Sequence, residues 1–338
     1  MTLRIPGEVL VMGAGTIGCY LGGSLAAAGV PVTLVGRPRT LDAVATRGLT
    51  VTDLDGRKTH VAAGQVRLAP QVPAGARPAL VLLCVKSGAT AEAAAQLAAA
   101  LPAGTGVLSM QNGISNAAVA AQAGAGLVVL PGMVPYNVAE LDPGAYHRGT
   151  AGRLVAQRHD ALDGWPPVFE AAGVPLDLVD DARPIQWGKL LLNLNNPVNA
   201  LSGLPLRAEL MERGYRRCFA ALMEEALGVL ARAGIAPAQV AALPPGKLLK
   251  VLRLPSPVFR IVAARMLKID AKARSSMADD LTLGRRTEVD ALCGEVVRLA
   301  QAHGMQAPRN AKMVQLLDVW PRKPEQLSPA RMSEALGL

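Results

Sequence analysis

The sequence predicts an α/β fold: a Rossmann-type, doubly wound parallel sheet over residues 1–181, followed by an all-helical domain over residues 182–338. In the first half, short β-branched runs alternate with alanine-rich stretches, which is typical of βαβ units. The glycine-rich segment 13-GAGTIG-18 lies between the first strand and the first helix of this pattern. Beyond residue 181 the strand pattern gives way to helical periodicity.

The strands of the sheet are predicted from short apolar runs at 8–12, 32–35, 79–85, 106–110 and 127–131. Helices are predicted between them at 16–28, 38–47, 88–100 and 115–123, with Ser87 as the N-cap of the third. Two ribbons are also predicted, a hairpin over 49–61 that turns at Asp55-Gly56 and a second over 134–156 that turns near Asp142-Pro143-Gly144. In the second domain, helices are predicted at 184–201, 212–233, 257–268, 276–284, 288–303 and 308–319. Thr287 is the expected N-cap of the helix that Glu288 opens, and proline-rich breaks are predicted at 243–246 and 254–257.

Composition narrows the classes of partner. The net charge of +9 suits a small anionic cofactor or substrate, or is background basicity without a partner. Lys and Arg are scattered and aromatic residues make up only 3%, which argues against nucleic-acid binding. The uncharged segment Val9–Gly36 is broken by seven glycines and Pro31, so we expect a buried segment and no membrane association. The four cysteines and four histidines are dispersed, which predicts reduced thiols, a cytoplasmic location and no metal site.

The segment 13-GAGTIG-18 has the G-x-G-x-x-G spacing of a dinucleotide-binding loop. Gly13 would permit the tight turn, Gly15 would let the backbone approach a pyrophosphate, and Gly18 would let the helix pack closely on the strand. The pyrophosphate would lie on the N–H groups at the helix start. The predicted cofactor contacts of this loop are therefore Gly13, Ala14, Gly15, Thr16, Ile17 and Gly18.

The end of the second strand, 35-VGRPR-39, predicts which dinucleotide binds. An NAD site would place a carboxylate there to hold the ribose 2′-hydroxyl, but this chain has two arginines and no acid. A guanidinium pairs well with a 2′-phosphate. The sequence therefore predicts NADPH/NADP+, with Arg37 as the main contact and Arg39 as a weaker candidate. A solvated surface arginine is the alternative for both, and the favoured interpretation of Arg39.

The stretch 187-WGKLLLNLNNPVNALSG-203 places a lysine and four asparagines among leucines. At about 100° per residue, Lys189, Asn193 and Asn196 fall within a row roughly 60° wide, which predicts a polar cavity lined by one amine and two amides. A half-buried lysine has a lowered pKa, which suits a general acid; the alternative is a lysine that reaches from a core helix to water. Asn195 and Asn199 lie on another face, where structural hydrogen bonds are the better interpretation.

The chain resembles the ketopantoate reductase (2-dehydropantoate 2-reductase) family from Val9 to about Leu317. The motifs that carry the resemblance are the glycine loop with Arg37, 84-CVKS-87, 111-QNG-113, 187-WGKLLLN-193 and 275-SSMADDLTLGRRTEVD-290. The family combines a Rossmann domain with a helical domain, has its active site in the cleft between them, and uses NADPH to reduce ketopantoate to pantoate on the route to pantothenate and coenzyme A.

The resemblance also implies roles for single residues. Lys189 matches the catalytic general acid, and Glu288 matches a glutamate that contacts both substrate and cofactor. Asn193 matches a substrate-binding asparagine, and Ser276 matches a serine that holds the substrate carboxylate.

Lys86 and Asn112 match residues near the nicotinamide end of the cofactor. Both follow predicted strands, at the edge where doubly wound sheets bind ligands, so we predict that Asn112 contacts substrate as well as cofactor. A plain Asn-Gly turn at Asn112-Gly113 is the alternative.

Two departures from the family pattern bear on the substrate. Between Lys189 and Pro197 the chain is one residue shorter, so the second substrate-contacting asparagine is Asn196, by alignment on the proline, or Asn195; the row shared with Lys189 favours Asn196. The region 235–275 is longer than in compact members. The alternatives to a ketopantoate reductase are a reductase of another branched 2-oxo acid and a non-catalytic NADP(H)-binding sensor, although a sensor would not need both Lys189 and Glu288. The expected partners are a small 2-oxo acid and a second copy of the chain in a homodimer.

Overall fold

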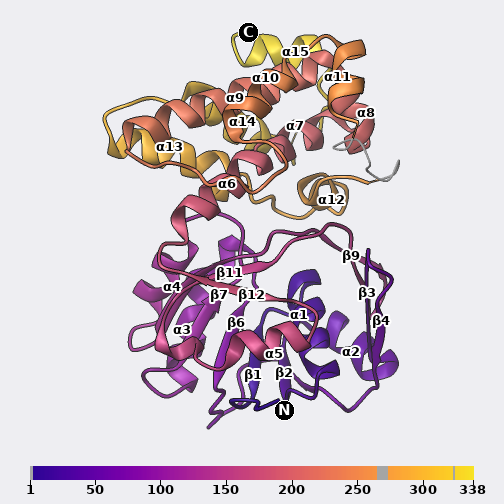
Figure 1. Ribbon diagram of the computed structural model, residues 1–338, viewed down its shortest axis with the longest axis vertical. Coiled ribbons are helices and arrows are strands. Elements are labelled where there is room, and N and C mark those ends of the chain that lie inside the picture. The colour runs from indigo at the N-terminus through magenta and orange to yellow at the C-terminus, as the bar shows by residue number, and fades with distance from the viewer. Residues whose placement is uncertain (1–2, 265–272, 323) are drawn as a thin grey trace. The chain divides into compact units, whose positions relative to one another are not determined.

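The computed structural model describes residues 3–264, 273–322 and 324–338 (Figure 1). The chain divides into two compact units, Met1–Ala182 and Arg183–Leu338. The division falls one residue after the boundary expected from the sequence. Among the described residues, no helix is both long and apolar enough to cross a membrane.

An eight-stranded sheet forms the centre of the first unit, in the order β12-β11-β8-β7-β6-β1-β2-β5. Its strands are β1 (Val9–Met12), β2 (Val32–Val35), β5 (Arg67–Ala69), β6 (Leu80–Leu83), β7 (Gly106–Ser109), β8 (Val128–Met133), β11 (Leu154–Gln157) and β12 (Leu176–Val179). The five strands predicted from apolar runs are confirmed, and β5, β11 and β12 were not predicted as members of the sheet. The sheet is mixed and not wholly parallel, because β11 pairs antiparallel with β8 and parallel with β12. No crossover helix is needed between antiparallel neighbours, and the chain between β8 and β11 forms a hairpin instead.

Helices cover both faces of this sheet, as the continuous apolar strands predict. On one face, the helices α1 (Thr16–Ala27) and α5 (Trp165–Ala171) share a core with Val9 and Val11 of β1. On the other, α3 (Thr90–Ala100) and α4 (Asn116–Ala123) share a core with Leu10 and Met12. The remaining helical elements are α2 (Pro38–Arg47) and the 3₁₀ turns η1 (Ser87–Ala89) and η2 (Asp160–Leu162). The predicted N-cap is wrong, because Ser87 lies inside η1 and α3 begins only at Thr90.

Both predicted hairpins are present, and they join in a second sheet of order β4-β3-β10-β9. Its strands are β3 (Leu49–Asp53), β4 (Lys58–Val61), β9 (Val138–Asp142) and β10 (Ala145–Arg148). The guanidinium of Arg148 is buried and bonds Asp53 at 3.2 Å, which ties β10 to β3. Helix α1 packs against strands of both sheets.

The strand order places a topological switch point at β1. The chain adds β2 and β5 on one side of β1, and then adds β6, β7 and β8 on the other. Open α/β sheets bind ligands at the carboxyl ends of the strands that flank such a point. Here those ends lead into the segments that follow Met12 and Leu83, which are the glycine loop and the segment 84-CVKS-87.

The second unit is helical throughout its described part. Its elements are α6 (Arg183–Asn193), α7 (Asn195–Ser202), α8 (Leu206–Met211), α9 (Arg213–Arg232), α10 (Pro245–Leu252), α11 (Ser256–Val262), α12 (Ser276–Thr282), η3 (Val289–Ala291), α13 (Cys293–Ala302), α14 (Pro308–Val319) and α15 (Pro329–Ala335). The predicted helices at 212–233 and 308–319 are confirmed. Helix α10 begins inside a predicted proline-rich break, since proline is well tolerated in the first turn of a helix. Part of the predicted helix 257–268 lies outside the described residues.

Two predicted helices are interrupted. The helix predicted over 184–201 ends at Asn193 and resumes at Asn195, because Pro197 has no N–H to bond the carbonyl of Asn193. The helix predicted over 288–303 is also wrong. Glu288 precedes the 3₁₀ turn η3, and the non-helical backbone of Leu292 separates that turn from α13.

Candidate active site

The glycine loop between β1 and α1 has the steric features expected of a dinucleotide cradle. Gly13 has φ +110°, and a Cβ there would lie 2.6 Å from the backbone nitrogen of Val85, so the turn requires glycine. A Cβ at Gly18 would lie 2.1 Å from the carbonyl oxygen of Gly13, which shows how closely α1 approaches the loop. A Cβ at Gly15, by contrast, would meet no heavy atom within 4 Å. The backbone at Gly15 is therefore open to a ligand.

The start of α1 suits an anionic group. Gly15 occupies the N-cap position and offers no side chain to bond the first N–H groups of the helix. Gly15 and Thr16 are exposed, and the first turn of α1 contains no acidic residue. Ala14 is buried and its N–H bonds the carbonyl oxygen of Val35 at 2.9 Å, which fixes the loop to the end of β2. The helix dipole then favours negative charge above an open, rigid loop.

Arg37 follows β2 beside this loop. A Cβ at Gly36 would lie 2.4 Å from the Cβ of Ala14, so glycine at this position lets the end of β2 approach the loop closely. Arg37 is the N-cap residue of α2, and both Arg37 and Arg39 are exposed. Both arginines were predicted from the sequence, whereas the role of Gly36, whose small size brings Arg37 near the glycine loop, was not.

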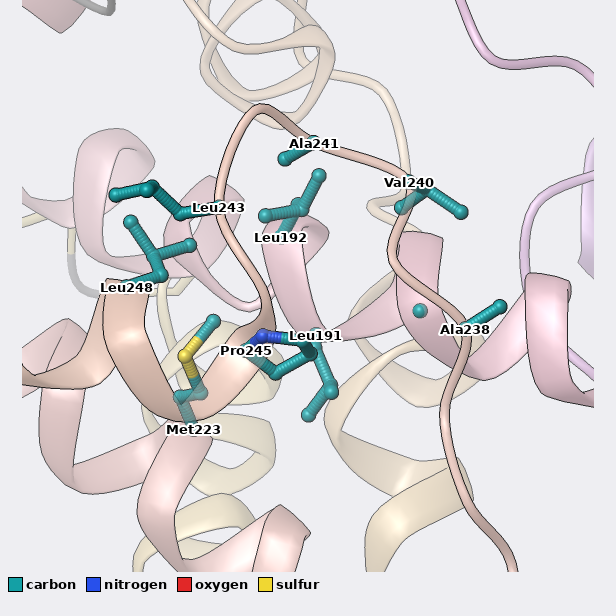
Figure 2. A pocket seen from close by; sticks show the side chains of 10 residues that line it. Leu191, Leu192, Met223, Ala238, Val240, Ala241, Leu243, Pro245 and Leu248 are labelled. Atoms are coloured by element: carbon teal, nitrogen blue, oxygen red, sulfur yellow. The ribbon is translucent and has the colours of Figure 1, made fainter.

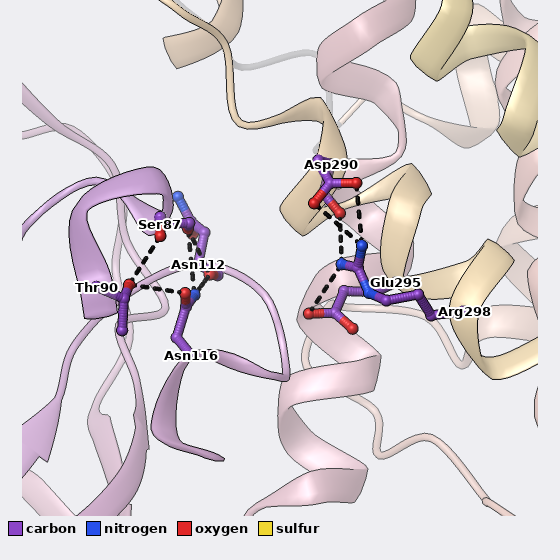
Figure 3. Close-up of polar contacts among 7 residues, drawn as sticks. All are labelled: Ser87, Thr90, Asn112, Asn116, Asp290, Glu295 and Arg298. Atoms are coloured by element: carbon purple, nitrogen blue, oxygen red, sulfur yellow. Dashed lines mark hydrogen bonds and ion pairs between the residues drawn. The ribbon is translucent and has the colours of Figure 1, made fainter. Parts of the chain in front are cut away.

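A polar network joins the segments that follow β6 and β7 (Figure 3). The side chain of Asn116 donates to the carbonyl oxygen of Asn112 at 2.5 Å and to the hydroxyl of Ser87 at 3.2 Å. The hydroxyl of Thr90 donates to the side-chain oxygen of Asn116 at 3.0 Å. Gln111 adds bonds to Thr90 at 2.7 Å and to the carbonyl oxygen of Val85 at 2.9 Å. The network fixes both segments at the carboxyl edge of the sheet.

Lys86 and Asn112 are placed by this network. Lys86 is exposed at the N-cap position of η1, and Asn112 is partly exposed. Both residues were predicted from the sequence, whereas the buried Gln111, Thr90 and Asn116 were not. The motif 111-QNG-113 contains Gln111, but a role was predicted only for Asn112, which follows it.

In the helical unit, Lys189, Asn193 and Asn196 are each partly exposed, whereas Asn195 and Asn199 are buried. We call the first three residues the open row and the other two the buried pair. The division between them that the sequence predicted holds, although the helix breaks at Leu194. The buried pair makes the structural hydrogen bonds that the sequence favoured. Asn195 donates to Glu209 at 3.0 Å, and Asn199 donates to the carbonyl oxygen of Leu204 at 3.1 Å.

The environment of Lys189 changes its acidity. Burial lowers the pKa of the Lys189 ammonium from 10.5 to about 8, and the charge of Glu288 opposes part of this shift. The residue as a whole keeps part of its surface open to solvent. A lysine with a pKa of about 8 is still mostly protonated at neutral pH and gives up its proton more readily than an exposed lysine.

Glu288 is the N-cap residue of the 3₁₀ turn η3. Figure 3 shows the contacts that Arg298 makes with Asp290 of this turn. The guanidinium of Arg298, in α13, bonds both carboxylate oxygens of Asp290 at 3.0 Å and the carbonyl oxygen of Asp290 at 2.8 Å. Arg298 also pairs with Glu295 at 3.4 Å. These contacts fix the turn to α13, and Glu288 is partly exposed at its start.

Ser276 is exposed at the first position of α12, and the buried Ser275 before it is the N-cap. The N–H of Ser275 bonds the side-chain oxygen of Asn199 at 2.9 Å, and its hydroxyl donates to the carbonyl oxygen of Asn196 at 3.3 Å. The predicted substrate serine therefore follows a residue that is bonded directly to α7. The bonds of Ser275 to α7 were not predicted from the sequence.

An apolar recess lies between α6 and other segments of the helical unit (Figure 2). Gly188, Leu191 and Leu192 of α6 face Met223 of α9 and the segment 238–248 across it. All of the lining residues are apolar or glycine. The recess packs α6 against the rest of the unit and offers no group for proton transfer.

The fold and the glycine loop define the class of the protein, a pyridine-nucleotide-dependent oxidoreductase. The model of ketopantoate reductase PanE/ApbA matches residues 9–161, and that of ketopantoate reductase PanE/ApbA C terminal matches residues 181–320. A 2-dehydropantoate 2-reductase from Halobacterium salinarum is 32% identical over 89% of this chain and 94% of its own length. A ketopantoate reductase structure from Ralstonia eutropha is 31% identical with a TM-score of 0.77, and the match covers 94% of this chain and 99% of that one. The chain belongs to the ketopantoate reductase PanE/ApbA family, which confirms the resemblance drawn from its motifs.

Proposed function

We propose that the chain reduces 2-dehydropantoate to pantoate with NADPH, in the synthesis of pantothenate and coenzyme A. The observation that carries the proposal is the row of partly exposed polar side chains in α6 and α7, Lys189, Asn193 and Asn196, among otherwise buried neighbours. Burial lowers the pKa of the Lys189 ammonium, and the charge of Glu288 opposes this shift. Family membership supports the same reaction, because relatives along nearly the whole chain are 2-dehydropantoate 2-reductases. A homologous reductase would need such a proton donor at the substrate carbonyl.

The first unit would bind the dinucleotide. The open backbone at Gly15 and the first turn of α1 fit a pyrophosphate, and Lys86 and Asn112 would hold the nicotinamide end. Arg37 would pair with the 2′-phosphate and so select NADPH over NADH. Replacing Arg37 with Ala should reduce this preference about 10- to 100-fold, the free energy of one or two charge-assisted hydrogen bonds. Arg39→Ala is the matched control, and an unaltered preference in Arg37→Ala would place the 2′-phosphate elsewhere.

The second unit would bind the 2-oxo acid and supply the proton. The bound cofactor supplies the hydride. Lys189 would stabilise the oxyanion that develops at the substrate carbonyl and then protonate it. Ser276 would bond the substrate carboxylate, and Asn193 and Asn196 would bond its carbonyl and hydroxyl oxygens. Glu288 would accept a hydrogen bond from the substrate hydroxyl and contact the cofactor, while its charge raises the pKa of Lys189 and so favours the protonated amine.

A reductase of another branched 2-oxo acid is the second candidate. It is favoured by the region 235–275, where α10 and α11 extend the helical unit, and by the one residue that is missing between Lys189 and Pro197. Steady-state assays of NADPH oxidation with a panel of 2-oxo acids distinguish the two candidates. We expect kcat/KM for 2-dehydropantoate to exceed that for the other acids. A clear preference for a different acid would transfer the assignment to that substrate, and tight NADPH binding without turnover would indicate a sensor.

The proposed enzyme works in the cytoplasm, where its four free cysteines would stay reduced. We expect no nucleic-acid or membrane partner. A homodimer remains a prediction, and sedimentation equilibrium would test it.

A further inference from the structure

The carboxyl group of Glu209, in α8, is completely buried in the helical unit. The side chain of Asn195 donates from Nδ2 to its Oε2 at 3.0 Å. Within the described part of the chain, the other carboxyl oxygen, Oε1, and the side-chain oxygen of Asn195, Oδ1, have no hydrogen-bond partner. The two unsatisfied oxygens therefore belong to two groups that are already joined by one hydrogen bond.

Among the described contacts, the guanidinium of Arg216 forms no salt bridge with the carboxyl group of Glu209. Arg216, in α9, is completely buried and stacks on the ring of Phe259 at 4.1 Å. Its guanidinium bonds five neutral oxygens at 2.8–3.2 Å, those of Leu210, Met211, Leu252, Leu254 and Ser256. A guanidinium has only five N–H donors. None is left for Glu209.

We propose that Glu209 carries a proton in the folded protein and acts as a positioning residue for the substrate-binding asparagines. Its Oε1–H donates to Oδ1 of Asn195 while Nδ2 of Asn195 donates to Oε2, so that acid and amide form a cyclic pair. One proton thereby satisfies both unpaired oxygens, and it removes a buried negative charge that would be costly without a direct partner.

The electrostatic surroundings agree with this assignment. Burial raises the pKa of Glu209 from 4.5 to about 8, and the interactions with Asn195, Asn199 and the charge of Arg216 only partly oppose the shift. Among the described residues, Tyr215 and Cys218 of α9 also interact with Glu209, and burial raises the pKa of each, so both are neutral. Glu212 is exposed and interacts with Tyr215 and Arg216.

The pair formed by Glu209 and Asn195 is connected to the open row through the chain itself. This step rests on the proposed function. Asn195 is the first residue after the break at Leu194, between Asn193 and Asn196. Asn199, which also faces Glu209, bonds the N–H of Ser275, the residue before Ser276. Glu209 thus anchors the two asparagines that hold the proposed substrate contacts in α7 and α12.

The proposal predicts a pH dependence with a definite sign. A carboxyl group with a raised folded-state pKa stabilises the protein fully below its unfolded value of 4.5, and this contribution is lost as pH rises to about 8. Lys189 acts with the opposite sign in another window. Because its pKa is lowered, its contribution to stability increases as pH rises from about 8 to 10.5.

The test compares the wild type with Glu209→Gln, which keeps the shape and hydrogen-bonding pattern of the protonated acid, and with Glu212→Gln as an exposed control. Thermal unfolding is measured at a series of pH values between 4.5 and about 8. We expect Glu209→Gln to match the wild type at low pH and to lose the decline of Tm with pH, whereas Glu212→Gln keeps it. An unchanged decline in Glu209→Gln, or a large drop in its Tm at every pH, would overturn the proposal. This measurement needs no turnover, so it stands even if the proposed substrate is wrong.

The positioning role is tested by the KM for the 2-oxo acid at and above pH 8. Ionisation of Lys189 affects the wild type and Glu209→Gln alike, so the ratio of their KM values isolates Glu209. We expect the KM of the wild type divided by the KM of Glu209→Gln to rise about tenfold as the wild-type carboxyl ionises, the equivalent of one lost hydrogen bond. A ratio that stays constant with pH would refute the positioning role.

Discussion

Helices α6 and α7 carry two sets of polar side chains that differ in exposure. Lys189, Asn193 and Asn196 form the open row, each with part of its surface accessible. Asn195 and Asn199 form the buried pair, and both bond within the helical unit. The residue types are almost the same, and the two asparagines of each set lie three or four positions apart. The surroundings therefore decide the role: an amide with accessible surface can bind a substrate, whereas an enclosed amide holds the fold together.

Removing the ammonium of the open row should have the largest effect. We expect Lys189→Ala to lower kcat by about 10²- to 10⁴-fold, the usual contribution of a positioned general acid. NADPH affinity should stay nearly unchanged, because the glycine loop and Arg37 lie in the other unit. Single-turnover kinetics and fluorescence titration with NADPH measure the two effects, with the exposed Lys250→Ala as the control. An unchanged kcat would remove the general-acid assignment.

The next largest effect is expected at Asn196, the open amide of α7. Asn196→Ala should raise the KM for the 2-oxo acid about 10-fold, since one hydrogen bond to a charged or polarised substrate is lost. Its Tm should change little, because a partly exposed side chain is removed. If the KM stayed at the wild-type value while the KM of Asn195→Ala rose, Asn195 would be the substrate contact.

Asn195→Ala should mainly affect stability. The substitution leaves the buried carboxyl of Glu209 without its amide partner, which costs about 1–3 kcal/mol. We expect a Tm lower by several degrees, with a smaller change in kcat than in Lys189→Ala. Differential scanning calorimetry of Asn195→Ala beside Asn196→Ala measures the contrast directly. Equal Tm values in the two variants would mean that the open row and the buried pair do not differ in role.

The sequence was most informative where the constraint is local. Gly13 and Gly18 were predicted from the spacing of the motif together with the strand before it and the helix after it, and each is required by a close backbone approach. The open row could also be predicted, because helical periodicity separates Lys189 from Asn195 even though the helix breaks at Leu194. The break at Leu194 was not predicted, because the apolar periodicity indicated one continuous helix over 184–201 in spite of Pro197.

Long-range partners could not be predicted. Glu209 is 14 residues from Asn195, and Arg216 is 38 residues from the carbonyl of Leu254 that it bonds. No short motif relates such positions, and a glutamate or arginine in an amphipathic helix is usually solvated. The 3₁₀ turn after Glu288 was missed for the same reason, since the Arg298 contacts that hold it come from the following helix.

The central claim is that Lys189 donates the proton, and the pH dependence of the hydride-transfer step tests it most directly. The rate is measured in single turnovers with saturating NADPH and 2-dehydropantoate. Because the protonated amine is the active form and its pKa is lowered to about 8 by burial, the rate should be constant at lower pH and fall about tenfold per pH unit above that value. A rate that stays constant to a pH well above the pKa of an ordinary lysine would show that the proton comes from another group.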